Sequence, residues 1–120
     1  MREDMLSSVL SELNSTSADI EASGIISTDG LIMTALIPQH MDEDRLGAMS
    51  AAMLSLGERT ATELARGKLE QVLIKGEYGY VLMTHAGEEG VLTVLAKPNT
   101  KLGLIFLDVK RAAETVTALL

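Results

Sequence analysis

The chain has 120 residues and a formal net charge of −7, from ten Lys and Arg residues against seventeen Asp and Glu residues. This length fits one domain with a sizeable core, and the negative charge disfavours nucleic acid or an anionic membrane as a partner. Hydrophobic residues make up 47% of the sequence, which is typical of a globular protein, and the absence of cysteine excludes disulfides, thiolate metal sites and thiol nucleophiles. We therefore expect a single domain over residues 1–120.

The N-terminal segment MREDMLSSVL lacks the basic start and the apolar stretch of a signal peptide. No apolar run approaches the roughly eighteen residues of a membrane-spanning helix. The sequence therefore predicts a cytoplasmic protein that does not insert into a membrane.

The first predicted element is a helix over residues 3–16, with two acidic residues in its first turn. Its apolar residues recur at helical spacing, as Met5, Leu6, Val9, Leu10 and Leu13. Two strands then follow, over residues 18–27 and 31–37, with Asp29-Gly30 between them. Asp-Gly between two apolar runs predicts a tight hairpin in which both turn residues adopt a positive φ.

The second predicted helix begins at an N-cap, Asp42, and ends at Arg66 before Gly67. It would have about twenty-four residues and a length of roughly 36 Å. No charged residue occurs from Gly47 to Gly57, whereas a helix on the surface of a domain normally presents a polar face to water. Each glycine costs about 1 kcal/mol relative to alanine, so the lack of a side chain must serve a purpose.

A helical projection of this segment separates three faces. Large side chains form one stripe, which we expect to pack on the chain's own sheet: Leu46, Met49, Met53, Leu56, Thr60 and Leu64. Small residues dominate the second stripe: Gly47, Ala51, Leu54, Ala61 and Ala65. The third face is Ala48, Ala52, Ser55, Arg59, Glu63 and Arg66. The two small faces predict close contact with a second copy and with a partner, although the helix propensity of alanine is an alternative explanation.

Three more strands are predicted over residues 69–75, 78–85 and 91–97, joined by turns rich in glycine and acidic residues. The last two runs are apolar at successive positions, so both faces of the sheet should be covered by helices. Residues 98–100 end the sheet and offer an N-cap for a final helix that reaches Leu120. The predicted order of elements is α-β-β-α-β-β-β-α.

Patterns that indicate catalysis or metal binding are missing. His40 and His85 have no second ligand at metal spacing, and turn chemistry accounts for Asp29. The nucleophile elbow, the Walker A loop and the dinucleotide motif are absent, and the acidic turn 87–90 has the wrong charge for phosphate. We therefore assign no catalytic, cofactor-binding or metal-binding residue, and we expect a protein that is not an enzyme.

Together these features resemble the roadblock family of dynein light-chain-like proteins over nearly the whole chain. The resemblance rests on the segments SGIISTDGLIMTAL, ELARGKLEQVLI, EYGYVLMTHAGEEGVLTVLA and LGLIFLDVKRAAETV. It implies an α/β fold, a three-layer α/β/α sandwich with roadblock-like and profilin-like topology. A five-stranded antiparallel sheet would have the long helix on one face and the two terminal helices on the other.

The resemblance also implies a homodimer, because in such proteins two chains pair through the third strand, here residues 69–75, with their long helices side by side. Carried onto this sequence, the dimer interface comprises Gly47, Ala51, Leu54, Ala61, Ala65, Glu70, Val72 and Ile74. Bacterial and archaeal relatives regulate small Ras-like GTPases, which dock on the paired helices. The corresponding residues here are Arg45, Ala48, Ala52 and Arg59. The resemblance gives the arginines no catalytic role, since such relatives reposition the GTPase's own residues.

The expected function is therefore that of a homodimeric scaffold that binds and regulates a small Ras-like GTPase, in a GTPase-activating or co-regulatory role. A heterodimer with a related chain stays open. Two other functions also stay open: a small-molecule sensor, because related layered folds hold ligands between sheet and helix, and a hydrolytic enzyme. A ligand in a well-formed apolar cavity would favour the sensor.

Overall fold

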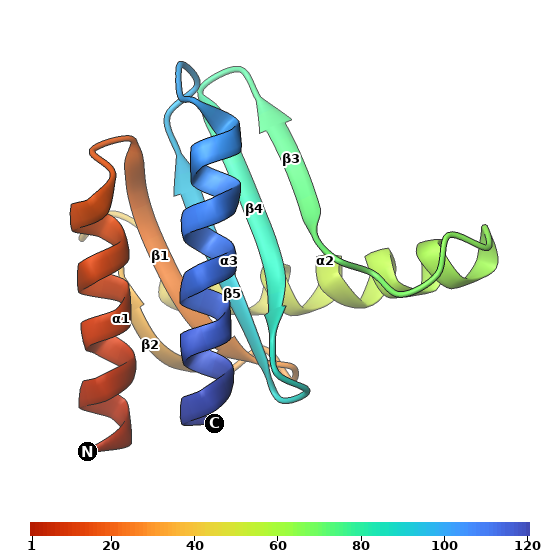
Figure 1. Ribbon diagram of the computed structural model, residues 1–120, viewed down its shortest axis with the longest axis horizontal. Helices are drawn as coiled ribbons and strands as arrows, with labels where there is room; N and C mark the ends of the chain where they lie inside the picture. Colours follow the sequence, from red (N-terminus) through yellow and green to blue (C-terminus); the bar gives the residue numbers. More distant parts are fainter.

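The computed structural model describes residues 1–120 and has three layers (Figure 1). Helices α1 and α3 cover one face of a five-stranded antiparallel sheet, and α2 crosses the other face, which confirms the predicted fold class. The three helices fall short of the combined length and apolar character that a membrane span requires. The elements in chain order are α1 (Arg2–Thr16), β1 (Ile20–Ser27), β2 (Ile32–Leu36), α2 (Glu43–Glu63), β3 (Val72–Gly76), β4 (Gly79–Ala86), β5 (Gly90–Ala96) and α3 (Leu102–Leu119).

The sheet has the strand order β2-β1-β5-β4-β3, and every neighbouring pair is antiparallel. Strands β3, β4 and β5 form the predicted meander, and β1 pairs with β5 on the far side of it. As a result β2 and β3, which come from different halves of the chain, are the two edge strands.

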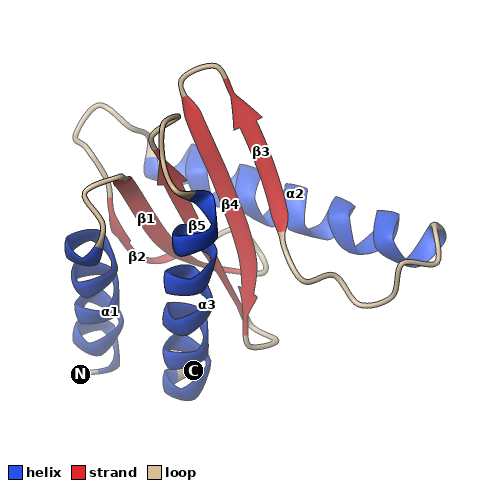
Figure 2. Cartoon of the chain, turned by 45° about the horizontal axis from the view of Figure 1, so that its top comes forward, coloured by secondary structure: helices blue, strands red, loops and turns tan.

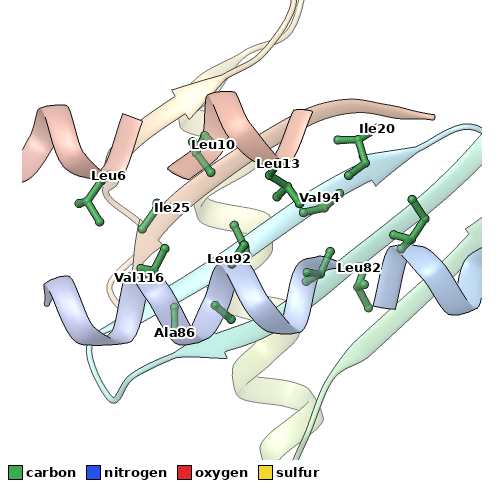
Figure 3. Packing of buried hydrophobic residues seen from close by; sticks show 14 residues of the cluster. Leu6, Leu10, Leu13, Ile20, Ile25, Leu82, Ala86, Leu92, Val94 and Val116 are labelled. Atoms are coloured by element: carbon green, nitrogen blue, oxygen red, sulfur yellow. The ribbon is translucent and has the colours of Figure 1, made fainter. Parts of the chain in front are cut away.

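The larger core lies between the sheet and the helices α1 and α3 (Figure 3). Leu6, Leu10 and Leu13 repeat at helical spacing, so one face of α1 is buried against the sheet. Leu92 and Leu82 point at these helices from β5 and β4. Burial of a leucine side chain contributes about 1.5–3 kcal/mol, so this layer supplies most of the hydrophobic stabilisation.

The smaller core lies under α2 and contains Ile26, Leu54, Met83 and Val91. It includes one buried polar contact, because the hydroxyl of Thr93 on β5 donates to Ser50 Oγ on α2 at 2.8 Å. Both residues are buried, and no buried side-chain nitrogen or oxygen of the protein lacks a partner. This hydrogen bond fixes the position of α2 over the central strand of the sheet.

The hairpin between β1 and β2 forms where it was predicted, but the turn type differs. Gly30 has a φ of 91°, whereas Asp29 keeps a negative φ. The Ser27 carbonyl accepts a hydrogen bond from the Gly30 N–H at 2.9 Å, and the Ser27 N–H donates to the Leu31 carbonyl at 2.8 Å. This pattern describes a three-residue loop that needs only one residue in the left-handed region.

Predicted boundaries differ by a few residues at the start of β3, at the start of α3 and at the end of α2. The strand β3 begins at Val72 rather than Leu69, because residues 69–71 leave the sheet and the Glu70 carbonyl accepts a hydrogen bond from the Thr84 hydroxyl at 2.9 Å. The N-cap of α3 is Lys101, which makes no side-chain capping bond. Thr100 instead donates to the Asp19 carboxylate at 3.0 Å and ties this loop to the start of β1.

Candidate protein-interaction surface

Helix α2 begins at a well-formed cap and crosses the whole sheet. The Asp42 carboxylate accepts hydrogen bonds from the backbone N–H groups of Asp44 and Arg45, at 2.9 and 3.2 Å. From there the helix contacts all five strands in turn. Its C-terminal end extends past the edge strand β3, with no part of the sheet behind it (Figure 2). One end of α2 is therefore anchored on the domain and the other projects from it.

The face of α2 that packs on the sheet is rotated from the predicted one toward the stripe of small residues. Gly47 and Leu54, from the stripe of small residues, are buried. Met49, Leu56 and Leu64, from the stripe of large residues, are exposed by 61%, 56% and 64%. The prediction that the large side chains cover the chain's own sheet is therefore wrong for these three residues, whereas Leu46 and Met53 are half-buried and Met53 packs on the core under α2.

The glycines of α2 explain this rotation. A Cβ atom on Gly47 would lie 2.5 Å from the carbonyl oxygen of Gly30, in the turn between β1 and β2. A Cβ atom on Gly57 would lie 2.9 Å from the Val72 Cγ2 atom. Both distances are shorter than a van der Waals contact, so the missing side chains let α2 approach its own chain closely.

A single helix leaves much of this face of the sheet open. Because α2 runs across the strands, it covers only about 10–12 Å of their length, whereas a strand of 8 residues is about 26 Å long. A groove of about 520 Å³ remains between α2 and the strands β3, β4 and β5. Met49 and Met53 form one wall, and Ile74, Val81 and Leu95 line the sheet side. Most of the residues that line this groove are hydrophobic, as is typical of a protein core, although no helix covers them.

A second hollow, of about 380 Å³, lies beside the projecting half of α2 and continues this apolar surface. Leu56, Thr60 and Ala61 line it on the helix, and Leu69 and Val72 line it on the segment that leads into β3. The free edge of β3 is adjacent, and its Leu73 and Ile74 are exposed by 40% and 39%. An apolar surface that combines a groove, a hollow and a strand edge is typical of a protein-binding site.

The structure distributes the predicted dimer residues unevenly. Gly47 and Leu54 are already covered by the chain's own turn and sheet, so neither residue is available to a second chain. The half-buried residues of this set are Ala51, Ala61 and Val72, and the exposed ones are Ala65, Glu70 and Ile74.

The four residues predicted to contact a GTPase, Arg45, Ala48, Ala52 and Arg59, are all exposed. Three of them lie on the side of α2 that faces away from the sheet, and Arg59 makes an exposed ion pair with Glu63 at 3.5 Å. An isolated pair of this kind contributes at most about 1 kcal/mol, so Arg59 is free to change partners.

The polar side chains near α2 do not form a cluster of metal ligands. His85 Nε2 lies 3.2 Å from Glu58 Oε1, which links β4 to α2, and His40 lines the large groove. The structure forms no group of three or more His, Cys, Asp or Glu side chains that could hold a metal ion.

The groove between α2 and the strands β3, β4 and β5 was not predicted from the sequence. The sequence feature that relates to the groove is the run of apolar residues at successive positions of β4 and β5. This feature predicts that helices cover both faces of the sheet, but it does not reveal how much of a face one helix covers.

A scan against protein families matches residues 5–96 to the Roadblock/LC7 domain. The chain belongs to the Roadblock/LC7 family. This match includes most of α1, all of α2 and all five strands, and therefore all of the surface described above.

Relatives in this family include an uncharacterized protein of Methanocaldococcus jannaschii, MJ1340, which is 44% identical over 115 residues that span 96% of this chain and 99% of that protein. The gliding protein MglB of Thermus thermophilus has the same fold, with a TM-score of 0.86 at 19% identity over 98% of this chain and 90% of that one. LokiProfilin1, solved in complex with rabbit actin, has a TM-score of 0.63 at 16% identity and covers 98% of this chain and 97% of its own. At such low identities the structural likenesses establish a common Roadblock and profilin-like fold.

Proposed function

We propose that this Roadblock/LC7 protein forms a homodimer through α2 and β3, and that the dimer binds and regulates a small Ras-like GTPase as a scaffold without catalysis of its own. The observation that carries the proposal is the incomplete layer over one face of the sheet. This layer leaves an apolar groove, an open strand edge and a projecting helix next to one another. The fold shared with MglB and the resemblance to roadblock regulators of GTPases support it.

A dimer with a two-fold axis beside β3 would cover the groove, the open strand edge and the projecting end of α2 together. Pairing of β3 with its copy would close the open edge and extend the sheet across the dimer. The projecting half of each α2 would then lie over the other chain, where Leu56 and Leu64 would fill the groove lined by Ile74 and Val81. We therefore assign the dimer interface mainly to these exposed large residues rather than to Gly47 and Leu54.

The outward face of α2 supports the second part of the proposal. In the dimer two such faces would lie side by side and form a broad platform with few long side chains at its centre. Ala48 and Ala52 would form that centre, and Arg45 and Arg59 its rim. Small residues allow a partner to approach the backbone closely, and the arginines supply charged groups that orient it.

The docking face is tested with the double variant Ala48→Arg plus Ala52→Arg. Binding of purified Ras-like GTPases from the same genome, loaded with GDP or with a non-hydrolysable GTP analogue, is measured by interferometry. We expect binding to be abolished while circular dichroism and dimerisation are unchanged, because both alanines are exposed. The matched control is Thr115→Arg plus Ala118→Arg, which adds the same charge at exposed positions of α3 on the opposite layer. If the α2 variant still captures the GTPase, the proposed face is wrong.

A small-molecule sensor is a second candidate, because the groove of about 520 Å³ is apolar and of ligand size. The two functions compete for the same space, since a partner helix in the groove would exclude a ligand. Mass spectrometry of the denatured, purified protein distinguishes them. A stoichiometric small molecule would favour the sensor, and its absence together with a dimer would favour the scaffold.

A further inference from the structure

The second edge of the sheet, strand β2, is also open. This strand pairs with β1 alone, and its pairing is regular from Thr34 to Leu36. It contains neither a proline nor a charged residue, which are the usual means of protecting an edge from another strand. Leu31, just before it, is exposed by 70%. The backbone groups on its outer side are therefore available for pairing.

A groove of about 550 Å³ runs along this edge and is lined by residues 31–35. Its other lining residues are three acids: Glu3, from the first turn of α1, and Glu43 and Asp44, from the first turn of α2. These two helices lie on opposite faces of the sheet (Figure 1). A strand added at the edge would therefore pass between carboxylates on both sides, and no Lys or Arg residue lines the groove.

We propose that the β2 edge is a docking site for an extended, lysine- or arginine-containing segment of another protein, which adds to the sheet as a sixth strand. Main-chain hydrogen bonds to β2 would supply the affinity of such a complex. The three carboxylates would select basic side chains on the added segment. The edge therefore recognises an extended backbone and a positive charge together.

The same carboxylates disfavour a second copy of this chain as the occupant. Pairing of β2 with β2 would bring two sets of these acids together, between chains that each have a net charge of −7. The β2 and β3 edges lie at opposite ends of the sheet. Docking at β2 is therefore independent of the proposed dimer.

The test uses a short fluorescent peptide of alternating lysine and valine, whose binding is measured by fluorescence anisotropy. We expect saturable binding together with slower amide hydrogen exchange at residues 32–36. A peptide of the same sequence with N-methyl groups on alternate amides should not bind, because it keeps the charge and loses the main-chain donors. A glutamate-for-lysine peptide should not bind either.

The acidic rim is tested with the variant Glu43→Gln plus Asp44→Asn, which should weaken peptide binding about three- to tenfold at low salt. The control variant, Glu88→Gln plus Glu89→Gln, removes the same charge from the exposed turn between β4 and β5 and should leave binding unchanged. The proposal is overturned if the N-methylated peptide binds equally well, if the control variant weakens binding as much, or if no saturable binding occurs.

Discussion

At the scale of single residues, the glycines of α2 show that a small side chain does not by itself indicate contact with another chain. Gly47 lies against the turn between β1 and β2, and Gly57 lies against Val72. Glycine costs helix stability at both positions, and the close packing of α2 on its own sheet offsets that cost. The sequence alone predicted that the glycines allow a close contact. The structure shows that this contact is with residues of the same chain.

We predict that Gly47→Ala lowers the free energy of unfolding by about 1–2 kcal/mol, although alanine favours a helix. The new Cβ atom would lie 2.5 Å from a backbone carbonyl oxygen, which moves only if the turn moves. The matched control is Gly103→Ala in α3, where no atom lies within 4 Å of the added Cβ. That control should be neutral or gain up to about 1 kcal/mol in urea denaturation. Equal gains in both variants would contradict the close approach of α2.

At the scale of elements, helical and strand periodicity predicted the order, the layers and most boundaries. The α2 faces were assigned wrongly because a projection ranks faces by side-chain size, whereas packing also depends on the separation of the backbones. Leu54 is buried between small neighbours, while Met49 and Leu56 remain exposed. Of the candidate site, the exposure of Ala48 and Ala52 was predicted, whereas the groove under Met49 depends on the path of α2 across the sheet.

The C-terminus of α2 gives a prediction for this element. The helix ends at Glu63 and not at Arg66, because Ala65 adopts a φ of 56° and its N–H bonds to the Thr62 carbonyl at 3.2 Å. The Arg66 N–H donates to the Ala61 carbonyl at 2.7 Å, which completes a Schellman motif with alanine at the position that favours glycine.

Ala65→Gly should therefore raise the free energy of unfolding by about 0.5–1 kcal/mol in urea denaturation, because glycine adopts this φ without strain. The control Ala48→Gly makes the same substitution at an exposed position within the helix and should cost about 1 kcal/mol. If both variants lose stability equally, Ala65 is not strained in solution.

At the scale of the whole molecule, the two faces of the sheet are unequal. Two helices cover one face, and one helix with a projecting end covers the other (Figures 1 and 2). The larger core belongs to the first face, and the exposed apolar residues of α2 belong to the second. A second chain that covers the open face would make the two faces equally buried. The thermal stability of the protein should therefore depend on its concentration.

We predict that the melting temperature rises by about 3–6 °C for each tenfold increase in protein concentration, because mass action adds about 1.4 kcal/mol to the stability of a dimer. Leu56→Glu plus Leu64→Glu should abolish this dependence, since both leucines are exposed in the single chain and would be buried only by a partner. Leu104→Glu plus Leu107→Glu replaces two exposed leucines on α3 and should leave the dependence intact. Scanning calorimetry, with sedimentation velocity at the same concentrations, makes the measurement. A wild-type melting temperature that stays constant over a hundredfold range would mean that the open face of the sheet is stable in water without a second chain.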